Sequence, residues 1–181
     1  MTQTQMPPMM DNYLVIYQLI QVVSQKYHCG VYPQINAGLR SNYPLITYEW
    51  VDPGSDVTRD ETDVMEVRLQ IDVQSTDMYE ALNMANDLRR TLAHSYGYRR
   101  FFKQAHVIPH DVNKAGSRNF YSGTQQAIYR YGFDCSFSIY QAGTIYKPDD
   151  LSFEFNEETI DSIKAMNGMN GKEIDVNKEE F

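Results

Sequence analysis

The chain has 181 residues, and its 24 acidic against 16 basic residues give a formal net charge of -8. This length suits one domain with a real hydrophobic core, and the acidic balance argues against a protein that holds nucleic acid through its phosphates. Cys29 and Cys135 are too few for a disulfide framework and lie in no metal-binding pattern, so we expect two free thiols and a reducing compartment. No secretory signal and no apolar run of about 20 residues is present, which predicts a soluble protein made inside the cell, away from membranes.

A helix with a wide apolar surface is predicted near the N-terminus. Residues 1–9 are polar and contain proline, and we interpret them as a flexible arm. Asp11 or Asn12 is positioned to cap the helix that follows, and Cys29-Gly30 is positioned to end it. Its apolar surface exceeds a narrow stripe, so the helix is either central to the core or partly covered by a neighbouring subunit.

Two strands carry the clearest pattern of the chain. Residues 31–42 are interpreted as a polar connection to a first strand over Tyr43–Val51, which is rich in aromatic and β-branched residues. A long charged loop, residues 52–63, then leads to a second strand over Val64–Gln74. The second strand alternates strictly, with Val67, Leu69, Ile71 and Val73 on one side and Glu66, Arg68, Gln70, Asp72 and Gln74 on the other.

A second helix is predicted over Met78–Leu92. Ser75, Thr76 and Asp77 supply oxygens that can cap its start, and apolar residues recur at helical spacing along it. The resulting stripe can lie on the apolar face of the two strands. Strands and helix together predict a layered α+β core.

The segment Tyr96–Lys103 mixes aromatic with basic residues. Such a mixture can stack on nucleic acid. The alternative, which we favour, is that Arg89, Arg90, Arg99 and Arg100 complement a helix C-terminus while the rings complete the core.

The rest of the chain predicts two further strands and an acidic end. A short strand is expected within Ala105–Val112, then turns over Asn113–Thr124 and a long alternating strand over Tyr129–Tyr140. From Lys147 onward ten acidic and four basic residues give a net charge of -6. Within this end, Leu151–Phe155 is compatible with an edge strand and Glu157–Met166 with a short helix, and the remainder is interpreted as flexible.

These elements predict one α+β domain over residues 10–146, flanked by the arm and by an acidic C-terminal extension over residues 147–181. We expect a mixed, mainly antiparallel sheet of about four strands packed against two principal helices, with the long loop between the first two strands.

Candidate catalytic groups do not fall into a recognisable site. His106 and His110 have a spacing that binds metal from a helix, but Pro109 disfavours a helix, and in a strand they would lie roughly 13 Å apart. The carboxylates at Asp60, Glu61 and Asp63, and at Asp149 and Asp150, have no calcium-loop spacing. No phosphate-binding loop, dinucleotide motif or nucleophile elbow is present. We therefore predict no catalytic, metal or cofactor site, and no enzymatic activity.

The order of these elements resembles the tail terminator (neck terminator) proteins of tailed bacteriophages. The likeness rests on the first helix, the polar connection into Tyr43-Pro-Leu-Ile-Thr-Tyr48, the charged loop, the alternating strand and the capped helix over Met78–Leu92. It covers roughly residues 10–142. The acidic extension past Lys147 is not part of the resemblance.

The resemblance implies a structural virion protein of the tail or neck. It implies a ring of identical subunits, commonly a hexamer, that ends the tail tube and contacts the tail tube protein and the head-completion or connector protein, while DNA passes the lumen without specific binding. On this reading we place inter-subunit or tube contacts on the loop and on the outer side of the second strand, at Asp56, Arg59, Asp60, Glu61, Glu66, Arg68 and Asp72.

Two other readings stay open. One is another head-tail connector or tail-completion protein with the same kind of core. The other is a metal-dependent or nucleic-acid-processing enzyme that uses His106, His110 and the carboxylates, with Arg99-Arg100 holding substrate.

Overall fold

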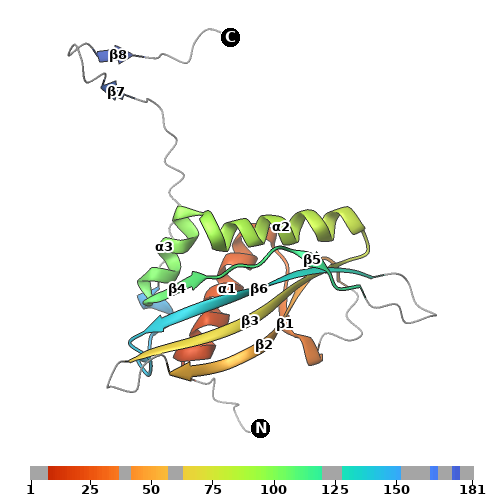
Figure 1. Cartoon of the computed structure of the whole chain (residues 1–181), viewed down its shortest axis with the longest axis horizontal. Helices are drawn as coiled ribbons and strands as arrows, with labels where there is room; N and C mark the ends of the chain where they lie inside the picture. Colours follow the sequence, from red (N-terminus) through yellow and green to blue (C-terminus); the bar gives the residue numbers. More distant parts are fainter. Residues whose placement is uncertain are drawn as a thin grey trace.

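The computed structural model describes residues 8–36, 42–56, 63–119, 128–151, 164–166 and 173–175. Three α-helices, eight strands and two short 3-10 helices lie in these ranges (Figure 1). In chain order they are α1 (Asp11–Tyr27), β1 (Val31–Pro33), η1 (Gln34–Asn36), β2 (Leu45–Asp56), β3 (Val64–Ser75), α2 (Met78–His94), α3 (Tyr96–Gln104), β4 (Val107–His110), β5 (Gly116–Ser117), β6 (Tyr129–Tyr140), η2 (Pro148–Asp150), β7 (Lys164–Met166) and β8 (Glu173–Asp175).

Six of these strands form one mixed sheet with the order β1-β2-β3-β6-β4, and β5 pairs with β6 beside β4. The β1–β2 pair is parallel, and the other pairs of this sheet are antiparallel. The predicted α+β class is therefore confirmed. The expected four strands and two helices match only roughly, because β1, β5 and α3 are additional.

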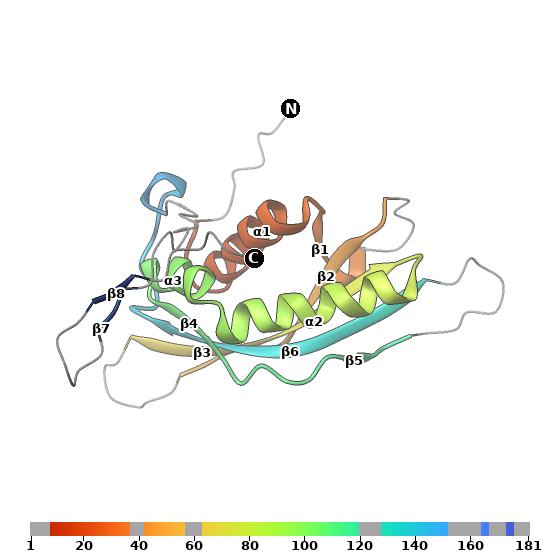
Figure 2. The ribbon, with the colours of Figure 1, turned by 90° about the horizontal axis from the view of Figure 1, so that it is seen from above.

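The sheet and the helices form two layers. Figure 2 shows α1, α2 and α3 on one side of the sheet. The strand β3 pairs along its whole length with β6, from Val64 opposite Tyr140 to Ser75 opposite Tyr129. The alternating side chains Val67, Leu69, Ile71 and Val73 all face the helices and are fully buried, as the sequence pattern predicts.

The helix α2 begins as predicted. The Asp77 side chain caps it by accepting a hydrogen bond from the Glu80 amide at 2.8 Å, and the Ser75 hydroxyl accepts one from the Asp77 amide at 3.0 Å. Its apolar stripe, with Ala81, Ala85, Leu88 and Leu92 fully buried, packs on β3 and β6. This burial is the main reason the segment is helical in the folded protein.

The helix α1 lies where the pattern predicts, but its predicted cap is wrong. Met10 occupies the N-cap position without a side-chain cap. Asp11 instead accepts a hydrogen bond from the Gly143 amide at 2.8 Å, and Asn12 donates to the Pro53 carbonyl at 2.6 Å. These side chains therefore tie the start of α1 to two loops rather than to its own backbone.

The aromatic and basic segment Tyr96–Lys103, whose arginines we expected at the C-terminus of the preceding helix, forms a separate helix, α3. Tyr98, Phe101 and Phe102 of this helix are buried, so these three rings complete the core, as we favoured, and are not available for stacking on nucleic acid. Gln18 of α1 donates to the Phe101 carbonyl at 3.1 Å. This bond gives a carbonyl in the last turns of α3 a side-chain partner from α1.

Three other expectations need correction. The first strand runs to Asp56, so part of the predicted loop is strand, interrupted by irregular register between Trp50 and Ser55. The polar connection contains β1, which pairs in parallel with β2. Three residues are too few for this strand to show a periodic pattern in the sequence. Residues Lys164–Met166, predicted to end a helix, form a strand paired with β8.

The core also reaches into both predicted flanking segments. Met9 is buried and forms a bridge with Tyr146, and Leu151 is buried in the same hydrophobic cluster. The edge strand expected over Leu151–Phe155 lies, apart from Leu151, outside the described residues. Among the described helices, none combines the length and the apolar character that crossing a membrane requires. Both cysteines are free, and burial raises the pKa of Cys135.

A polar contact joins the exposed sides of α1 and α2. Lys26 pairs with Asp87 at 2.7 Å, and the Tyr27 hydroxyl donates to the same Asp87 oxygen at 2.7 Å. Desolvation raises the pKa of Asp87, but the hydrogen bonds from Lys26 and Tyr27 outweigh it, so the pKa of Asp87 lies below its ordinary value of 3.8. The carboxylate therefore stabilises the folded chain above pH 4 and loses this contribution as the pH falls further.

We expect Asp87→Asn to lower the free energy of unfolding at pH 7 by less than about 1 kcal/mol, because both side chains of the ion pair are partly exposed and screened by solvent. The difference from the parent chain should shrink as the pH falls below about 4, because both chains then lack the charge. Urea unfolding at several pH values measures this difference in the free energy of unfolding. Asp149→Asn, at an exposed position, is the control; a difference for Asp87→Asn that does not change with pH would contradict this assignment.

Candidate assembly surface

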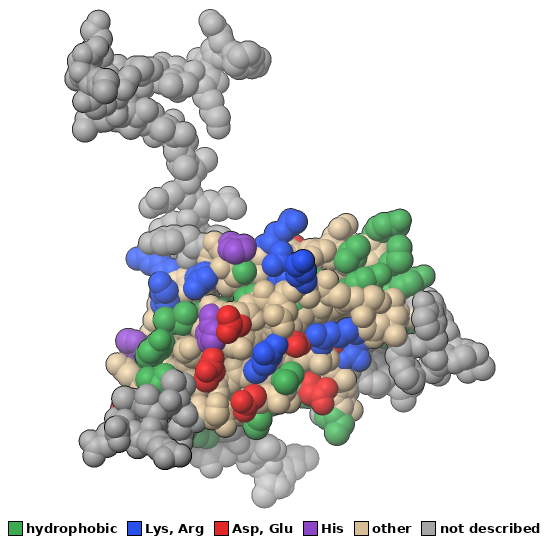
Figure 3. Space-filling view, viewed as in Figure 1, with side chains coloured by type: hydrophobic (Ala, Val, Ile, Leu, Met, Phe, Trp, Pro, Cys, Tyr) green, Lys and Arg blue, Asp and Glu red, His purple; other side chains and the backbone are tan. Residues whose placement is uncertain are grey.

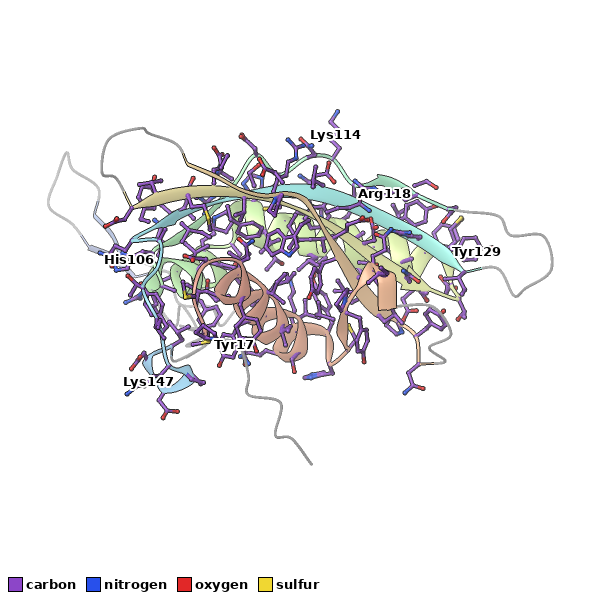
Figure 4. The ribbon with its side chains drawn as sticks, turned by 90° about the horizontal axis from the view of Figure 1, so that it is seen from below. Tyr17, His106, Lys114, Arg118, Tyr129 and Lys147 are labelled. Atoms are coloured by element: carbon purple, nitrogen blue, oxygen red, sulfur yellow. The ribbon has the colours of Figure 1, made fainter. Side chains whose placement is uncertain are left out.

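The helix layer covers one face of the sheet, and charged side chains occupy the other, which we call the outer sheet face. In Figure 3 acidic, basic and histidine side chains are interspersed over this face. Figure 4 shows Lys114 and Arg118 on the side of the sheet away from α1, with Tyr17 and Lys147 on the side of α1. The register places Glu66, Arg68, Gln70 and Asp72 of β3 opposite Ser138, Ser136, Asp134 and Gly132 of β6.

Asp72 lies at the centre of the outer sheet face and is fully buried. The Arg130 Nε atom donates to Asp72 Oδ2 at 2.8 Å, and Gln70 Nε2 donates to the same oxygen at 2.7 Å. Arg118 Nη1 lies 3.2 Å from Asp72 Oδ1, while Arg118 Nη2 pairs with Asp134 at 2.7 Å. One carboxylate thus connects β3 with β6 and with the segment that follows β5.

Gly132 makes room for this carboxylate. A Cβ atom at Gly132 would lie 1.7 Å from Asp72 Oδ1 and 2.6 Å from the Ile71 carbonyl oxygen. No side chain fits there without moving the strand or the carboxylate. The ion-pair cluster of Asp72, Arg118, Arg130 and Asp134 therefore depends on the absence of a side chain at Gly132.

We predicted Asp72 as a contact residue on the outer side of the second strand. The structure shows it fully buried and enclosed by two arginines and Gln70, and its contact with another subunit stays a prediction. A buried carboxylate is tolerated because it is paired, and removal of one partner from such a pair costs about 3–5 kcal/mol. In the described chain its contacts are intramolecular and structural.

The other predicted contact residues have different positions. Glu66 and Arg68 lie on the outer sheet face with side chains 41% and 39% exposed. Arg68 Nη2 lies 3.5 Å from Asp134. Asp56 ends β2, and Arg59, Asp60 and Glu61 lie outside the described residues, so contacts by these four stay a prediction.

A second polar cluster surrounds His110 at the end of β4. Its Nε2 atom lies 3.0 Å from Glu66 Oε1 and 2.9 Å from Ser138 Oγ, and its Nδ1 atom lies 3.2 Å from Asp111 Oδ2. The sequence pattern did not reveal this cluster, because only the order of β3, β6 and β4 brings Glu66 close to His110. His106, which we considered together with His110, is an exposed residue after α3.

The His110 cluster gives the enzyme alternative a geometry to consider. Ser138, His110 and Asp111 follow one another as a hydroxyl, an imidazole and a carboxylate, the order found in nucleophilic catalysis. However, Glu66 lies at the same imidazole nitrogen as Ser138, and Ser138 lies within β6 with β3 on one side and β4 on the other.

A pocket adjoins the His110 cluster between the end of α2, α3 and β4. Within it, Arg99 Nη1 donates to the Ala93 carbonyl at 2.6 Å, so this arginine is engaged with the last turn of α2. Its lining residues are Arg89, Ala93, His94, Arg99, Pro109, His110, Asp111 and Val112.

A comparison with protein families bears on the function of the chain. Residues 12–175 match the family described as phage neck terminator protein. The chain belongs to this family. The match confirms the resemblance seen in the sequence, and it extends to residue 175, so most of the acidic extension lies within the matched region.

Membership of the phage neck terminator family indicates a structural protein of the bacteriophage neck, and it fits a location in the virion. A comparison with curated proteins gives no match.

We expect Gly132→Ala to lower the free energy of unfolding by about 1–3 kcal/mol, because the added Cβ overlaps the Asp72 carboxylate and the Ile71 carbonyl. Gly116→Ala is the matched control, since a Cβ at this glycine of β5 meets nothing within 4 Å. Denaturant unfolding of both variants measures the difference. Equal stability of the two variants would show that Asp72 can move aside without cost.

Proposed function

We propose that this chain forms a ring that ends the phage tail tube and joins it to the head or neck connector, with DNA passing through the lumen. One observation carries the proposal beyond family membership: helices cover one face of the sheet, while the outer sheet face presents charged residues from adjacent strands (Figures 2 and 3). A surface rich in both signs of charge favours specific contacts with a complementary partner.

A closed ring built from head-to-tail contacts needs two different complementary surfaces on each subunit. The outer sheet face supplies one. The edge of the sheet at β1 and β2 is the candidate for the second, because among the described residues β1 pairs with β2 only over Ile46 to Tyr48. Exposed apolar side chains lie near it, with Ile35 of η1 91% and Val51 of β2 54% exposed.

The charge of the chain agrees with passage of DNA. A net charge of -8 disfavours strong binding of phosphates, whereas a basic lumen would hold the genome. We propose a hexamer, as the resemblance implies, with the tail tube protein on one side of the ring and a head-completion or connector protein on the other. Another connector or tail-completion role would use the same surfaces, and the identity of the bound partner separates the two.

Negative-stain imaging and mass measurement of the purified chain test the ring directly. Annular particles with a central hole are expected either for the chain alone or after addition of tail tubes, since some rings assemble only on their template. Particles that stay monomeric in both conditions would overturn the proposal. Binding to connector rings without binding to tube ends would indicate a different connector role.

We expect Arg68→Glu to reduce ring assembly at least several-fold, because it reverses a partly exposed charge at the centre of the outer sheet face. Arg59→Glu tests the loop in the same way. The control is Arg100→Glu, an exposed residue of α3 in the helix layer, which should assemble normally. Circular dichroism should be unchanged for all three variants; normal assembly of Arg68→Glu would remove this residue from the interface.

A further inference from the structure

We propose that Glu66, His110 and Asp111 form a binding site for a divalent transition-metal ion, with Zn²⁺ the best fit. One possible ligand atom from each of the three side chains lies within 4.8 Å of the other two. Ligand atoms around one tetrahedral zinc ion lie about 2.0–2.2 Å from the metal, hence about 3.3–3.6 Å apart. The three ligand atoms therefore need to approach one another by at most about 1.5 Å to share an ion.

The charges of the cluster favour a cation. Glu66 and Asp111 each have His110 as their ion-pair partner among the described residues. Two carboxylates thus share one imidazole. A divalent ion would neutralise both carboxylates, whereas the imidazole alone compensates at most one of them.

The scaffold holds the ligands from rigid elements. Glu66 lies in β3 and His110 in β4, on either side of β6, and the Glu66–Ser138 and His110–Ser136 pairs fix their positions along the sheet. Asp111 follows β4 directly with a left-handed φ of 46°, a conformation that aspartate and asparagine adopt more readily than most residues. The side chains of Glu66 and His110 are 41% and 29% exposed, so an ion can enter from solvent.

The ligand set determines the class of metal. One imidazole nitrogen with two carboxylate oxygens suits Zn²⁺ and its first-row neighbours, whereas Mg²⁺ and Ca²⁺ prefer sites made of oxygen alone. Glu66 lies at Nε2 and Asp111 at Nδ1, so the ion takes one nitrogen and the carboxylate at the other nitrogen turns toward it. With Nδ1 as the ligand, Nε2 keeps its hydrogen bond with Ser138, as ligating histidines commonly do. A bound ion would join β3 to the edge strand β4 across β6, on the outer sheet face. The site does not depend on the proposed ring.

Titration of the full chain with Zn²⁺ by calorimetry, and with Co²⁺ followed by visible absorption, tests the proposal. We expect one saturable site per chain and an increase in thermal stability with Zn²⁺, because an ion that binds the folded state stabilises it. Mg²⁺ at the same concentrations should not compete.

Three variants locate the site. Glu66→Gln and Asp111→Asn remove a charge while keeping size, and His110→Ala removes the nitrogen ligand; each should weaken Zn²⁺ binding at least about tenfold. His28→Asn is the matched control, since it removes a histidine at the C-terminus of α1, and asparagine tolerates the left-handed conformation there. Its affinity for Zn²⁺ should equal that of the parent chain.

Two results would overturn the site. One is the absence of saturable Zn²⁺ binding to the parent chain. The other is binding that persists unchanged in Glu66→Gln and Asp111→Asn, which would assign the ion to other histidines or to the acidic extension. Circular dichroism of each variant confirms that the fold is intact, and the two isosteric variants keep the test valid if His110→Ala unfolds.

Discussion

The burial of the Asp72 carboxylate at the centre of the sheet is the constraint on which the outer sheet face depends. Arg130 of β6 and Arg118 of the segment after β5 pair with this carboxylate, and the missing side chain at Gly132 leaves room for it. A buried charge without partners would cost several kcal/mol, so β3, β6 and the segment after β5 are held in one arrangement. The hydrophobic layer on the other face supplies stability, whereas this cluster fixes how the polar strands lie beside one another.

The same arrangement separates two kinds of surface. Helices and apolar strand residues form the inner layer, in which Tyr98, Phe101 and Phe102 of α3 are buried as part of the core. The outer sheet face keeps its charges and receives no helix from the described chain (Figure 2). For a member of the phage neck terminator family, a rigid charged sheet is a suitable surface for stacking against other virion proteins, because it presents fixed charge positions and loses little conformational entropy on binding.

Long periodic segments were predictable from the sequence. β3 and β6 have the expected bounds within a residue, and α2 has the expected cap at Asp77, because alternation and helical spacing record burial on one side of a single element. Short elements were not predictable. β1 has three residues and β5 has two, too few for a period, and α3 follows α2 after one residue, so its cations looked like the end of the preceding helix.

The sequence by itself determined the α+β class, the amphipathic faces and the resemblance to the neck terminator family, because these depend on local order and spacing. Tertiary structure alone decided which charges are exposed. Asp72 and Arg68 occupy equivalent places in the same alternating strand, yet one is enclosed by arginines from distant segments and the other is partly exposed. It also brought Glu66 to His110, because strand order is set by long-range pairing that no local pattern records.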